Sequence, residues 1–462
     1  MIETHFRKGT QTLKLGVAKV MHDLFPHETF KNSYSIGEGV FGNLVGSMLS
    51  VREVKLIEMK LREWVEQDSP IQFIERKDGY YHYQVGDMRV KIIYPAHTTT
   101  SLANPFTITP FSYGFIIDFS EANIKSNKPI EPPFLLASTY ESSQNWLNQV
   151  GIEFFSDINN YITSGRSLQL LDLAEAVQEK KISDIADFII KQRRALRVLL
   201  IAGPSSSGKT CFAQRIATQL QVLGMKTVSL SLNDYYLNRE QIPRDADGKY
   251  NFDCLEALDI PLLQQHLEQL IAGETVEVPV YDFIHGRRTN QPVTMHVGPD
   301  DILVVEGMHA LNPSLVPDIN RNLLFKVYVS ALGGLNFDLI NRMPTTEVRL
   351  LRRLVRDDWY RGSHPETTLS LWAGVRRGEE ENIFKFQEEA DVMFNSNILY
   401  EMNVLRPFAE SILSKISDDS PFRDTKERLM NLLTFFEPMD YAKVPFNSIL
   451  REFIGGGLYF SR

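Results

Sequence analysis

The spacing of apolar residues predicts a mixed α+β unit over residues 1–150. A helix expected over residues 50–67 carries an apolar side chain every three or four positions, which places these side chains on one face. An earlier amphipathic helix is expected before Pro26, and short strands bounded by glycine follow, such as 80–84 and 88–93. No catalytic pattern is apparent in this part of the chain.

From residue 197 the pattern changes to short apolar runs that alternate with helical segments. Runs of the length and β-branched character of buried strands lie at 198–202, 226–232, 301–305 and 323–330, and a helix is expected over 260–272. This alternation predicts an α/β fold with a mostly parallel, doubly wound sheet over residues 197–415. In such sheets ligands bind beyond the carboxyl ends of the strands.

Two further segments complete the predicted organisation. Residues 151–196 form a helical connector, in which Ile182, Ile185, Phe188 and Ile189 are expected to be the buried stripe. Residues 416–462 form a C-terminal helical extension with one helix over 427–436 and an apolar end over 449–460. The extension is expected to pack on the body or on another subunit, so a homo-oligomer is left open, and no chemistry is assigned to it.

A glycine-rich loop follows the first strand of the predicted sheet and reads GPSSSGKT, which fits G-x-x-x-x-G-K-[ST]. Between a strand and a helix, the N–H groups of such a loop form a concave anion site, its lysine reaches the β- and γ-phosphates, and its hydroxyl binds Mg²⁺. The sequence therefore predicts ATP and Mg²⁺ as cofactors. The cofactor-binding set is Gly203, Ser205, Ser206, Ser207, Gly208, Lys209, Thr210 and Cys211.

Acidic residues follow two other predicted strands. Asp234 comes directly after 226–232, where a carboxylate could accept the proton of an attacking hydroxyl. Glu306 follows 301–305, where a strand-end acid could hold Mg²⁺ together with Thr210. The structural alternatives are a helix cap for Asp234 and an ordinary strand-terminal acid for Glu306.

Arginines recur at helical spacing in a later segment. Arg349, Arg352, Arg353 and Arg356 fall at i, i+3, i+4 and i+7, and Arg361 follows them. Guanidinium groups in a row on one helix face can stabilise the charge of phosphoryl transfer. A phosphate-covering lid is favoured over a solvated surface because the glycine-rich loop lies upstream.

Two aromatic loops suggest an acceptor pocket. Phe252 and Asp253 follow a polar loop, and Tyr281 and Phe283 precede His285. Aromatic faces can stack a base, and a carboxylate can accept hydrogen bonds from ribose hydroxyls. Without a relative for comparison, they are equally well explained as ordinary aromatic loops.

Taken together, the motifs GPSSSGKT, LNDYY, NFD, VPVYDF, VVEG and RRLVRD resemble the uridine kinase and phosphoribulokinase family of P-loop kinases, in that family's order. The resemblance implies ATP-dependent phosphorylation of the 5′-hydroxyl of a nucleoside such as uridine or cytidine, with Asp234 as the general base. It implies a catalytic set of Asp234, Lys209, Arg353 and Arg356, with Arg361 on the nucleotide. The implied acceptor residues are Tyr236, Phe252, Asp253, Tyr281, Phe283, His285, Arg288 and Arg353.

The chain departs from the family pattern near the acceptor loop. His285 lies four residues after Tyr281, whereas the family histidine lies five after, and Arg287 and Arg288 follow. Ser363 stands where the family has a further arginine. The extra arginines could meet a substrate phosphate, which leaves open a kinase of a phosphorylated sugar or another small alcohol.

The front unit resembles the second additional domain of threonyl-tRNA synthetases in its order of elements and its LFP motif. The family's H-x-x-x-H editing positions fall on Leu15 and Lys19, and no cysteine precedes Cys211. Editing is therefore not expected, and a binding or assembly role is favoured. A nucleotide-dependent RNA-binding regulator is the alternative from another class.

The composition of the chain excludes several classes of function and site. The 462 residues carry a formal net charge of −9, which gives no general attraction to nucleic acid, and 43% of them are apolar. Two cysteines cannot form a disulfide framework or a four-ligand zinc site. No signal-peptide core or membrane-length apolar run is present, so a cytoplasmic protein with a small-molecule acceptor and no membrane partner is expected.

Overall fold

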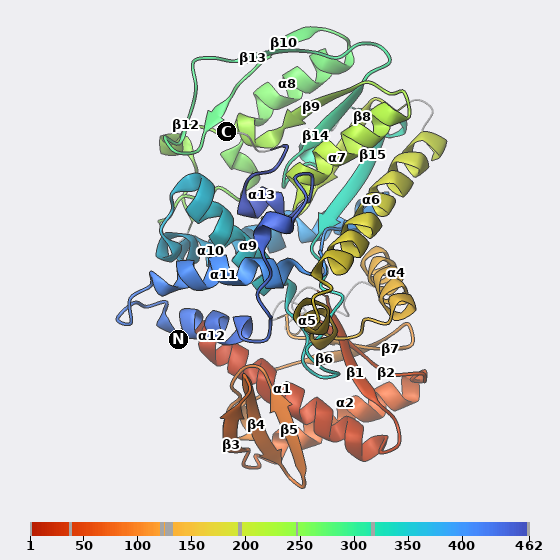
Figure 1. Cartoon of the computed structure of the whole chain (residues 1–462), viewed down its shortest axis with the longest axis vertical. Helices are drawn as coiled ribbons and strands as arrows, with labels where there is room; N and C mark the ends of the chain where they lie inside the picture. The colour runs from red at the N-terminus through yellow and green to blue at the C-terminus, as the bar shows by residue number, and fades with distance from the viewer. Residues whose placement is uncertain are drawn as a thin grey trace.

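The computed structural model describes residues 2–36, 39–120, 124, 133–192, 196–245, 248–315 and 319–459. Figure 1 shows an N-terminal unit at the bottom and a larger unit built around a parallel sheet above it. Helix α6 (Ser167–Gln192) runs along one side of the larger unit. The boundaries at residues 150, 196 and 415 stay predictions.

The N-terminal unit combines two helices with two antiparallel sheets. Its helices are α1 (Ile2–Leu24) and α2 (Val51–Glu66), and α2 begins with a capping box in which Ser50 and Glu53 exchange hydrogen bonds. One sheet has the order β1 (Phe30–Ile36), β2 (Gly39–Leu44), β7 (Gly114–Asp118), β6 (Thr107–Phe111). The other is β3 (Gln72–Lys77), β4 (Tyr80–Val85), β5 (Met88–Ile92). Both predicted helices are confirmed.

The larger unit is organised by a five-stranded sheet in which every pairing is parallel. Its order is β16 (Val392–Asn395), β15 (Leu324–Ser330), β8 (Val198–Ala202), β14 (Ile302–Glu306), β9 (Thr227–Ser231). The four strands expected from sequence therefore lie next to one another. The predicted α/β fold with a doubly wound parallel sheet is confirmed.

Helices cover both faces of this sheet because its central strand is apolar on both sides. In β8, Leu199 and Ile201 belong to the core formed with α6 and α7 (Lys209–Val222), whereas Leu200 belongs to the opposite core with α8 (Ile260–Ile271). All five residues of β8 are buried. Burial of each large apolar side chain stabilises the fold by about 1.5–3 kcal/mol.

The larger unit also contains two short hairpins and several helices. Two short hairpins pair β10 (Thr275–Val278) with β13 (Val293–His296) and β11 (Tyr281–Asp282) with β12 (Arg287–Arg288). The helices that follow β15 are α9 (Thr345–Arg361), α10 (Pro365–Asn382) and, after β16, α11 (Glu401–Ser414).

The connector, residues 151–196, is helical where the structure describes it, as expected, and contains α5 (Phe155–Thr163) and α6; α4 (Phe134–Val150) precedes it. In α6, Ile182, Ile185 and Ile189 are buried, but Phe188 is 40% exposed. The expectation for Phe188 was therefore wrong: its ring lies at the margin of the stripe, edge-on to Phe325 at 5.9 Å between centroids.

The C-terminal extension packs on the body, which is one of the two arrangements expected from sequence. It contains α12 (Arg423–Leu433) and α13 (Arg451–Ile454), and the former begins and ends earlier than the predicted 427–436. Ile449, Leu450 and Phe453 are fully buried. The last residue of the predicted apolar end, residue 460, lies outside the described residues.

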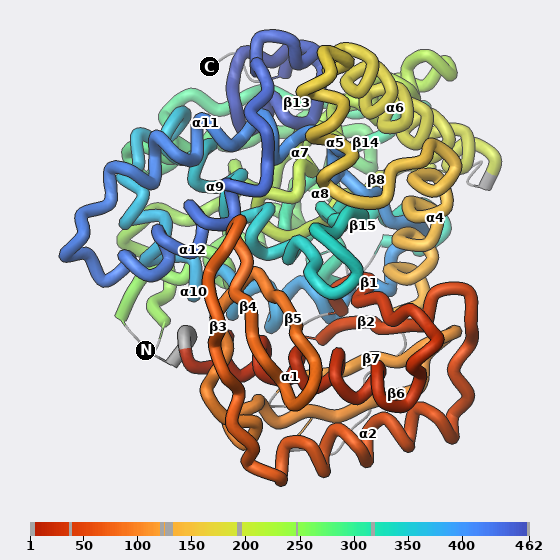
Figure 2. Tube along the Cα trace, turned by 60° about the horizontal axis from the view of Figure 1, so that its bottom comes forward, coloured from red at the N-terminus to blue at the C-terminus, as the bar shows by residue number. Residues whose placement is uncertain are grey.

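Side chains from distant parts of the chain fasten the two units together. The buried Glu347 of α9 accepts hydrogen bonds from Arg7 of α1, at 2.7 Å, and from Arg428 of α12. Figure 2 shows the β3–β4 hairpin beside α12, where Asn431 donates to the Gly79 carbonyl at 3.0 Å. We infer that the N-terminal unit and the extension act as one packed body with the sheet.

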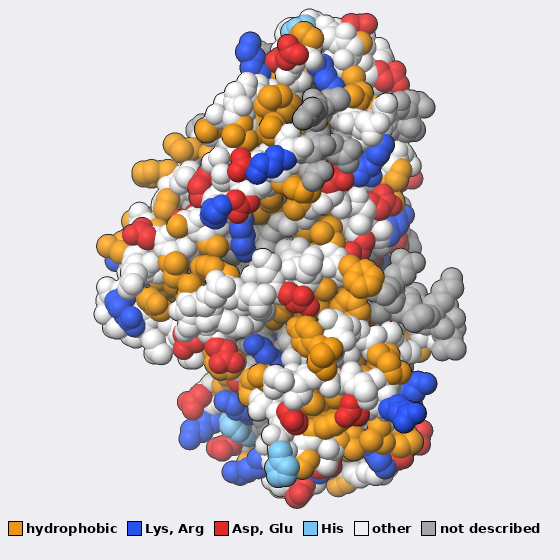
Figure 3. Space-filling view, turned by 90° about the vertical axis from the view of Figure 1, so that its right-hand side faces the viewer, with side chains coloured by type: hydrophobic (Ala, Val, Ile, Leu, Met, Phe, Trp, Pro, Cys, Tyr) orange, Lys and Arg blue, Asp and Glu red, His pale blue; other side chains and the backbone are white. Residues whose placement is uncertain are grey.

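The surface carries mixed charge. On the face drawn in Figure 3, lysines and arginines alternate with acidic side chains over the described residues of both units. No helix among the described residues combines the length and apolar character needed to cross a membrane.

Candidate active site

The glycine-rich loop connects β8 to α7 at the carboxyl edge of the sheet. Ser206 and Gly208 adopt left-handed backbone conformations, with φ of 58° and 87°. A Cβ atom on Gly203 would lie 2.2 Å from the Val329 carbonyl oxygen of the neighbouring strand. Glycine at 203 and 208 therefore lets the chain turn sharply against β15 and enter α7.

Two N–H groups of this segment are bound by carboxylates from other elements. The Ser205 N–H donates to Glu379 of α10 at 2.9 Å, and the Cys211 N–H donates to Glu452 of α13 at 3.1 Å. Both carboxylates are buried. The segment thus binds anionic groups at both ends, as expected for backbone amides gathered at a helix N-terminus.

Thr210, in the first turn of α7, lies beside Glu306 at the end of β14. The Thr210 hydroxyl donates to Glu306 Oε2 at 3.4 Å, and Ser231 donates to Glu306 Oε1 at 2.7 Å. A hydroxyl and a carboxylate are hard oxygen ligands of the kind Mg²⁺ accepts, with water and phosphate oxygens as its remaining ligands. Among the described residues, no three His, Cys, Asp or Glu side chains cluster as a metal site would require.

Lys209 is buried in the floor of the loop. Its ammonium donates to the Pro204 carbonyl at 3.5 Å, and its side chain lines a large cavity. Burial lowers the pKa of the Lys209 ammonium, although Glu306 and Glu452 oppose this effect. An anion in the cavity would compensate the buried charge.

That cavity, which we call the front cavity, has a volume of about 1250 Å³ and opens beside the loop. It brings together ten of the residues predicted from sequence: Ser205, Lys209, Tyr236, Phe252, Asp253, Tyr281, Phe283, Arg353, Arg356 and Arg361. Their elements are far apart in the chain, so their convergence is a property of the tertiary structure. Phosphate-loop, arginine and aromatic groups thus share one space.

Aromatic rings form one wall of the front cavity. The Tyr236 ring lies 5.6 Å from Tyr281 and 6.3 Å from Phe283, measured between centroids. Arg361 closes this wall, with its guanidinium 4.9 Å from the centre of the Phe283 ring. The wall offers apolar faces and one cation, which suits a planar ligand.

Asp253 and Asp234 lie at the same side of the sheet edge. Asp253 lines the front cavity, and burial raises the pKa of its carboxyl to about 6, although Arg353 opposes this shift. Asp234 is half-buried in the turn after β9, and its Oδ1 accepts the Tyr281 N–H at 3.2 Å. Asp234 is not among the residues that line the cavity, whereas its neighbour Asn233 is.

The arginines of α9 divide into two groups instead of forming one lid row. Arg353 and Arg356 line the front cavity, and Arg353 donates to the Ser205 hydroxyl at 2.8 Å. Arg349 and Arg352 are buried and bind Glu379 and Glu401. The expectation of a single row was wrong because one part of this helix face borders the front cavity and the other packs against buried carboxylates.

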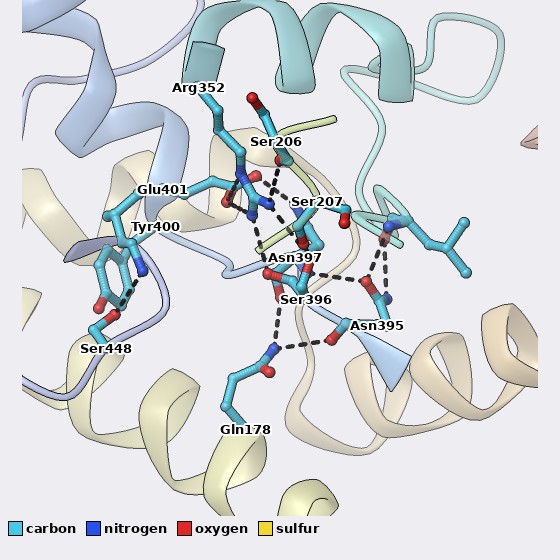
Figure 4. A network of polar contacts seen from close by, with 12 residues as sticks. Gln178, Ser206, Ser207, Arg352, Asn395, Ser396, Asn397, Tyr400, Glu401 and Ser448 are labelled. Carbon is cyan, nitrogen blue, oxygen red and sulfur yellow. Dashed lines mark hydrogen bonds and ion pairs between the residues drawn. The ribbon is translucent and has the colours of Figure 1, made fainter. Parts of the chain in front are cut away.

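Arg352 holds the loop from behind. It donates to the Ser206 carbonyl at 3.3 Å and the Ser396 carbonyl at 3.0 Å and pairs with Glu401 (Figure 4). In the same figure Gln178 of α6 donates to the carbonyls of Asn395 and Asn397, which flank Ser396, and so joins this network. Arg352 therefore supports the loop conformation.

Several predicted site residues lie outside the lining of the front cavity. His285 is exposed and bonds Asp282 at 2.6 Å. Arg288 donates to the Tyr235 and Tyr236 carbonyls and pairs with Asp259 at 3.0 Å, so its guanidinium braces the turn after β9. The others form the loop or its helix: Gly203, Ser206, Ser207, Gly208, Thr210, Cys211 and, on β14, Glu306.

The sequence analysis missed two carboxylates of this site. Glu379 lies in a run of charged residues on α10, and Glu452 lies in the extension to which no chemistry was assigned. Glu452 contacts a segment 241 positions earlier in the chain. No periodicity or motif marks such a long-range contact.

Comparison with known proteins gives matches to kinases. Residues 198–399 match the model of the phosphoribulokinase / uridine kinase family. A uridine kinase of Lactobacillus helveticus is 32% identical over 178 residues, which are 38% of this chain and 75% of that protein. A uridine kinase of Deinococcus deserti is 34% identical over 176 residues, again 38% and 75%.

A solved structure of a possible uridine kinase from Bacillus stearothermophilus aligns with 47% of this chain and 98% of that chain, at 20% identity and a TM-score of 0.33. The segment matched to the family ends at residue 399, before the extension that carries Glu452.

Proposed function

Because the chain belongs to the phosphoribulokinase / uridine kinase family and is an ATP-dependent kinase, we propose that it transfers the γ-phosphoryl group of ATP to the 5′-hydroxyl of a nucleoside, uridine or cytidine in type. One observation carries the proposal: the loop lysine, the arginines of α9 and the aromatic wall line the same cavity. A nucleoside requires an apolar wall for its base and a polar group for its ribose, and this cavity offers both.

The acceptor end of the cavity supports a nucleoside. The base would stack against Tyr236, Tyr281 and Phe283, and the Asp253 carboxylate would accept hydrogen bonds from ribose hydroxyls. Asp234 would accept the proton of the 5′-hydroxyl as general base. Its bond to the Tyr281 N–H couples its orientation to the aromatic wall.

The donor end of the cavity supports a triphosphate. The loop amides and Lys209 would bind the β- and γ-phosphates, and Arg353 and Arg356 would stabilise charge on the transferred group. Thr210 and Glu306 would hold Mg²⁺, which neutralises phosphate charge when bound. The motifs suggest no covalent intermediate, so we propose direct in-line transfer.

The acceptor could instead be a phosphorylated sugar, for which Arg287 and Arg288 were the sequence argument. Arg288 uses its guanidinium on Tyr235, Tyr236 and Asp259, and Arg287 is exposed. These contacts favour the nucleoside. The alternating charge of the face in Figure 3 likewise gives no support to an RNA-binding role.

A panel of acceptors tests the proposal. ADP release with ATP and Mg²⁺ is measured for uridine, cytidine, adenosine, ribulose 5-phosphate and glycerate, with the Asp234→Asn protein as the blank. We expect turnover with a pyrimidine nucleoside and little above blank with the sugar phosphate. Turnover confined to the sugar phosphate or glycerate would overturn the nucleoside assignment.

A further inference from the structure

A second cavity lies behind the glycine-rich loop and shares no lining residue with the front cavity. This rear cavity has a volume of about 170 Å³, several times the roughly 30 Å³ that one water occupies. Pro204 of the loop, Ser35 of β1 and Leu136 of α4 all line it. It therefore lies where residues 1–150 meet the loop.

The polar groups that line the rear cavity are cationic or neutral. Three guanidinium groups reach it, from Arg342, Arg349 and Arg376, together with hydroxyls that include Thr345 and Thr346. None of the described residues in its lining is an aspartate or a glutamate. A cavity with this composition attracts anions and repels cations.

Arg342 supplies a charge that the protein does not balance. Its guanidinium makes one long hydrogen bond, to the Met343 carbonyl at 3.5 Å, and no carboxylate of the described residues forms an ion pair with it. Burial lowers the pKa of Arg342 to about 10. Arg342 adds to the effect of burial in lowering the pKa of Lys14, on α1, to about 7.

The other two arginines share a carboxylate. Arg349 forms a two-bond ion pair with Glu379, and Arg376 pairs with Glu379 at 3.2 Å and with Glu380 at 3.3 Å. The Nε atom of the buried Arg349 has no hydrogen-bond partner in the described structure. Arg349 and Arg376 thus share the two carboxylates of Glu379 and Glu380, and the guanidinium without a carboxylate partner among the described residues is that of Arg342.

Helix α9 begins at the wall of the rear cavity. Thr345 and Thr346 are its first two residues, and the N-cap, Pro344, has no side chain that could accept their N–H groups. Within the described residues, neither N–H finds a protein acceptor. The amide ends of a 17-residue helix therefore add to the field of the three arginines.

We propose that the rear cavity is a binding site for a small oxyanion of the phosphate class, either inorganic phosphate or the phosphate group of a small phosphorylated molecule. The anion would bind Arg342 and the first amides of α9. It would lie against the face of the loop opposite the front cavity, where Arg349 donates to the Ser205 carbonyl at 3.0 Å. It would also join the loop to β1 of the N-terminal unit, through Ser35.

Binding of phosphate to the full chain tests this site without reference to kinase activity. Because the glycine-rich loop also binds phosphate in the proposed function, the background is the Lys209→Gln protein, titrated calorimetrically with inorganic phosphate in a phosphate-free buffer. We expect Lys209→Gln to retain one phosphate site, and added Arg342→Gln to weaken that site about tenfold or more. Equal affinity with and without Arg342 would overturn the proposal.

Thermal unfolding separates a binding role of Arg342 from a structural one. Phosphate should raise the Tm of the wild-type chain and of the control Arg423→Gln, in which an exposed arginine is replaced. The Arg342→Gln chain should show the wild-type Tm or a higher one without phosphate and a smaller rise with it. A lowered Tm with an unchanged phosphate response would show that Arg342 is structural and overturn the proposal.

A second variant covers the helix end. Thr345→Val with Thr346→Val removes both hydroxyls with little change of volume and should also weaken phosphate binding. Ribose 5-phosphate and uridine 5′-phosphate, each compared with its unphosphorylated form, identify the source of the phosphate group. Tighter binding of one of them than of inorganic phosphate assigns a phosphorylated molecule, and the reverse assigns free phosphate; equal binding of the phosphorylated and unphosphorylated forms would contradict the site.

Discussion

The front and rear cavities both border the glycine-rich loop, but they differ in whether their arginines are paired with carboxylates. In the front cavity Asp357 bonds Arg356 at 2.8 Å and lies 3.4 Å from Arg353. Although burial opposes ionisation, these arginines and Arg361 lower the pKa of Asp357 to about 2. In the rear cavity Arg342 has no such partner among the described residues.

This difference indicates how each space can be used. Arginines held by a carboxylate are kept in position and can meet a transferred phosphoryl group without binding free anions tightly. A half-buried arginine without a carboxylate partner is stabilised further when an anion binds. The front cavity is therefore suited to phosphoryl transfer, and the rear cavity is suited to stable binding of an anion.

The largest expected effect is on the front cavity alone. Asp234→Asn should lower kcat by about 10³-fold, because a general base contributes 10²–10⁴-fold, while the Kd for ATP changes little. Steady-state kinetics and calorimetry measure the two quantities. The control is Asp282→Asn, which changes the hydrogen-bond partner of the exposed His285 and should keep near-normal kcat. Near-normal phosphorylation by Asp234→Asn would remove it as the base.

The next effect concerns the start of α9, which borders the rear cavity. Glu347→Gln removes the buried carboxylate between Arg7 and Arg428 and should lower the free energy of unfolding by about 3 kcal/mol. Although burial opposes it, Arg428 and Arg7 lower the pKa of Glu347 to about 2, from 4.5. This stabilisation is present above about pH 4.5 and is lost as the pH falls towards 2.

Denaturant unfolding at pH 7 and pH 3 checks this sign. The difference between wild type and Glu347→Gln should be full at pH 7 and smaller at pH 3. Glu437→Gln, which changes an exposed side chain of the extension, is the control and should have no such effect. A difference that grows as the pH falls would contradict the ion-pair assignment.

A smaller effect is expected where the extension meets the donor end of the front cavity. Glu452 holds the Cys211 N–H, an amide that a donor phosphate would otherwise bind. Glu452→Gln replaces a charged competitor by a neutral one and should lower the Kd for ATP about fivefold, because a charged acceptor bonds more strongly. Calorimetric titration with Mg-ATP measures it, with Glu437→Gln again as control. Weaker ATP binding by Glu452→Gln would mean that this carboxylate assists the donor.

The smallest effect is a pH dependence of acceptor binding. With a pKa of about 6, Asp253 is mostly ionised at pH 7 and half-protonated at pH 6. The ionised form accepts hydrogen bonds from ribose hydroxyls more strongly than the protonated form, so the KM for the nucleoside should rise about twofold from pH 7 to pH 6. Asp253→Asn should abolish this change. A wild-type KM that decreases as the pH is lowered from 7 to 6 would contradict this role of Asp253.

The parallel sheet was predictable because its strands carry their environment in their composition. Residues 198–202 are apolar throughout since both faces of β8 are covered, and the predicted strand matches the observed one. The loop motif marked the site for a similar reason: glycine at 208 is required by the left-handed local backbone, with φ of 87°. Both signals are local, so they survive in a linear sequence.

The arginine row of α9 was predicted less well. Helical spacing indicates that Arg349, Arg352, Arg353 and Arg356 share a stripe, but it does not indicate what lies opposite. Glu379 and Glu401 come from later helices and turn two of the four into buried supports of the loop. The ion pairs that decide each role span 30 and 49 positions.

The amino-acid sequence by itself determined the α/β class, the anion-binding loop and the chemical types of the proposed site residues, because each depends on local backbone geometry or on periodic burial. Only the tertiary structure decided that Glu452 reaches Cys211, that Arg288 braces the turn after β9, and that a cationic cavity opens behind the loop. Those contacts join segments far apart in the chain, and the energy of a charge depends on which groups surround it after folding.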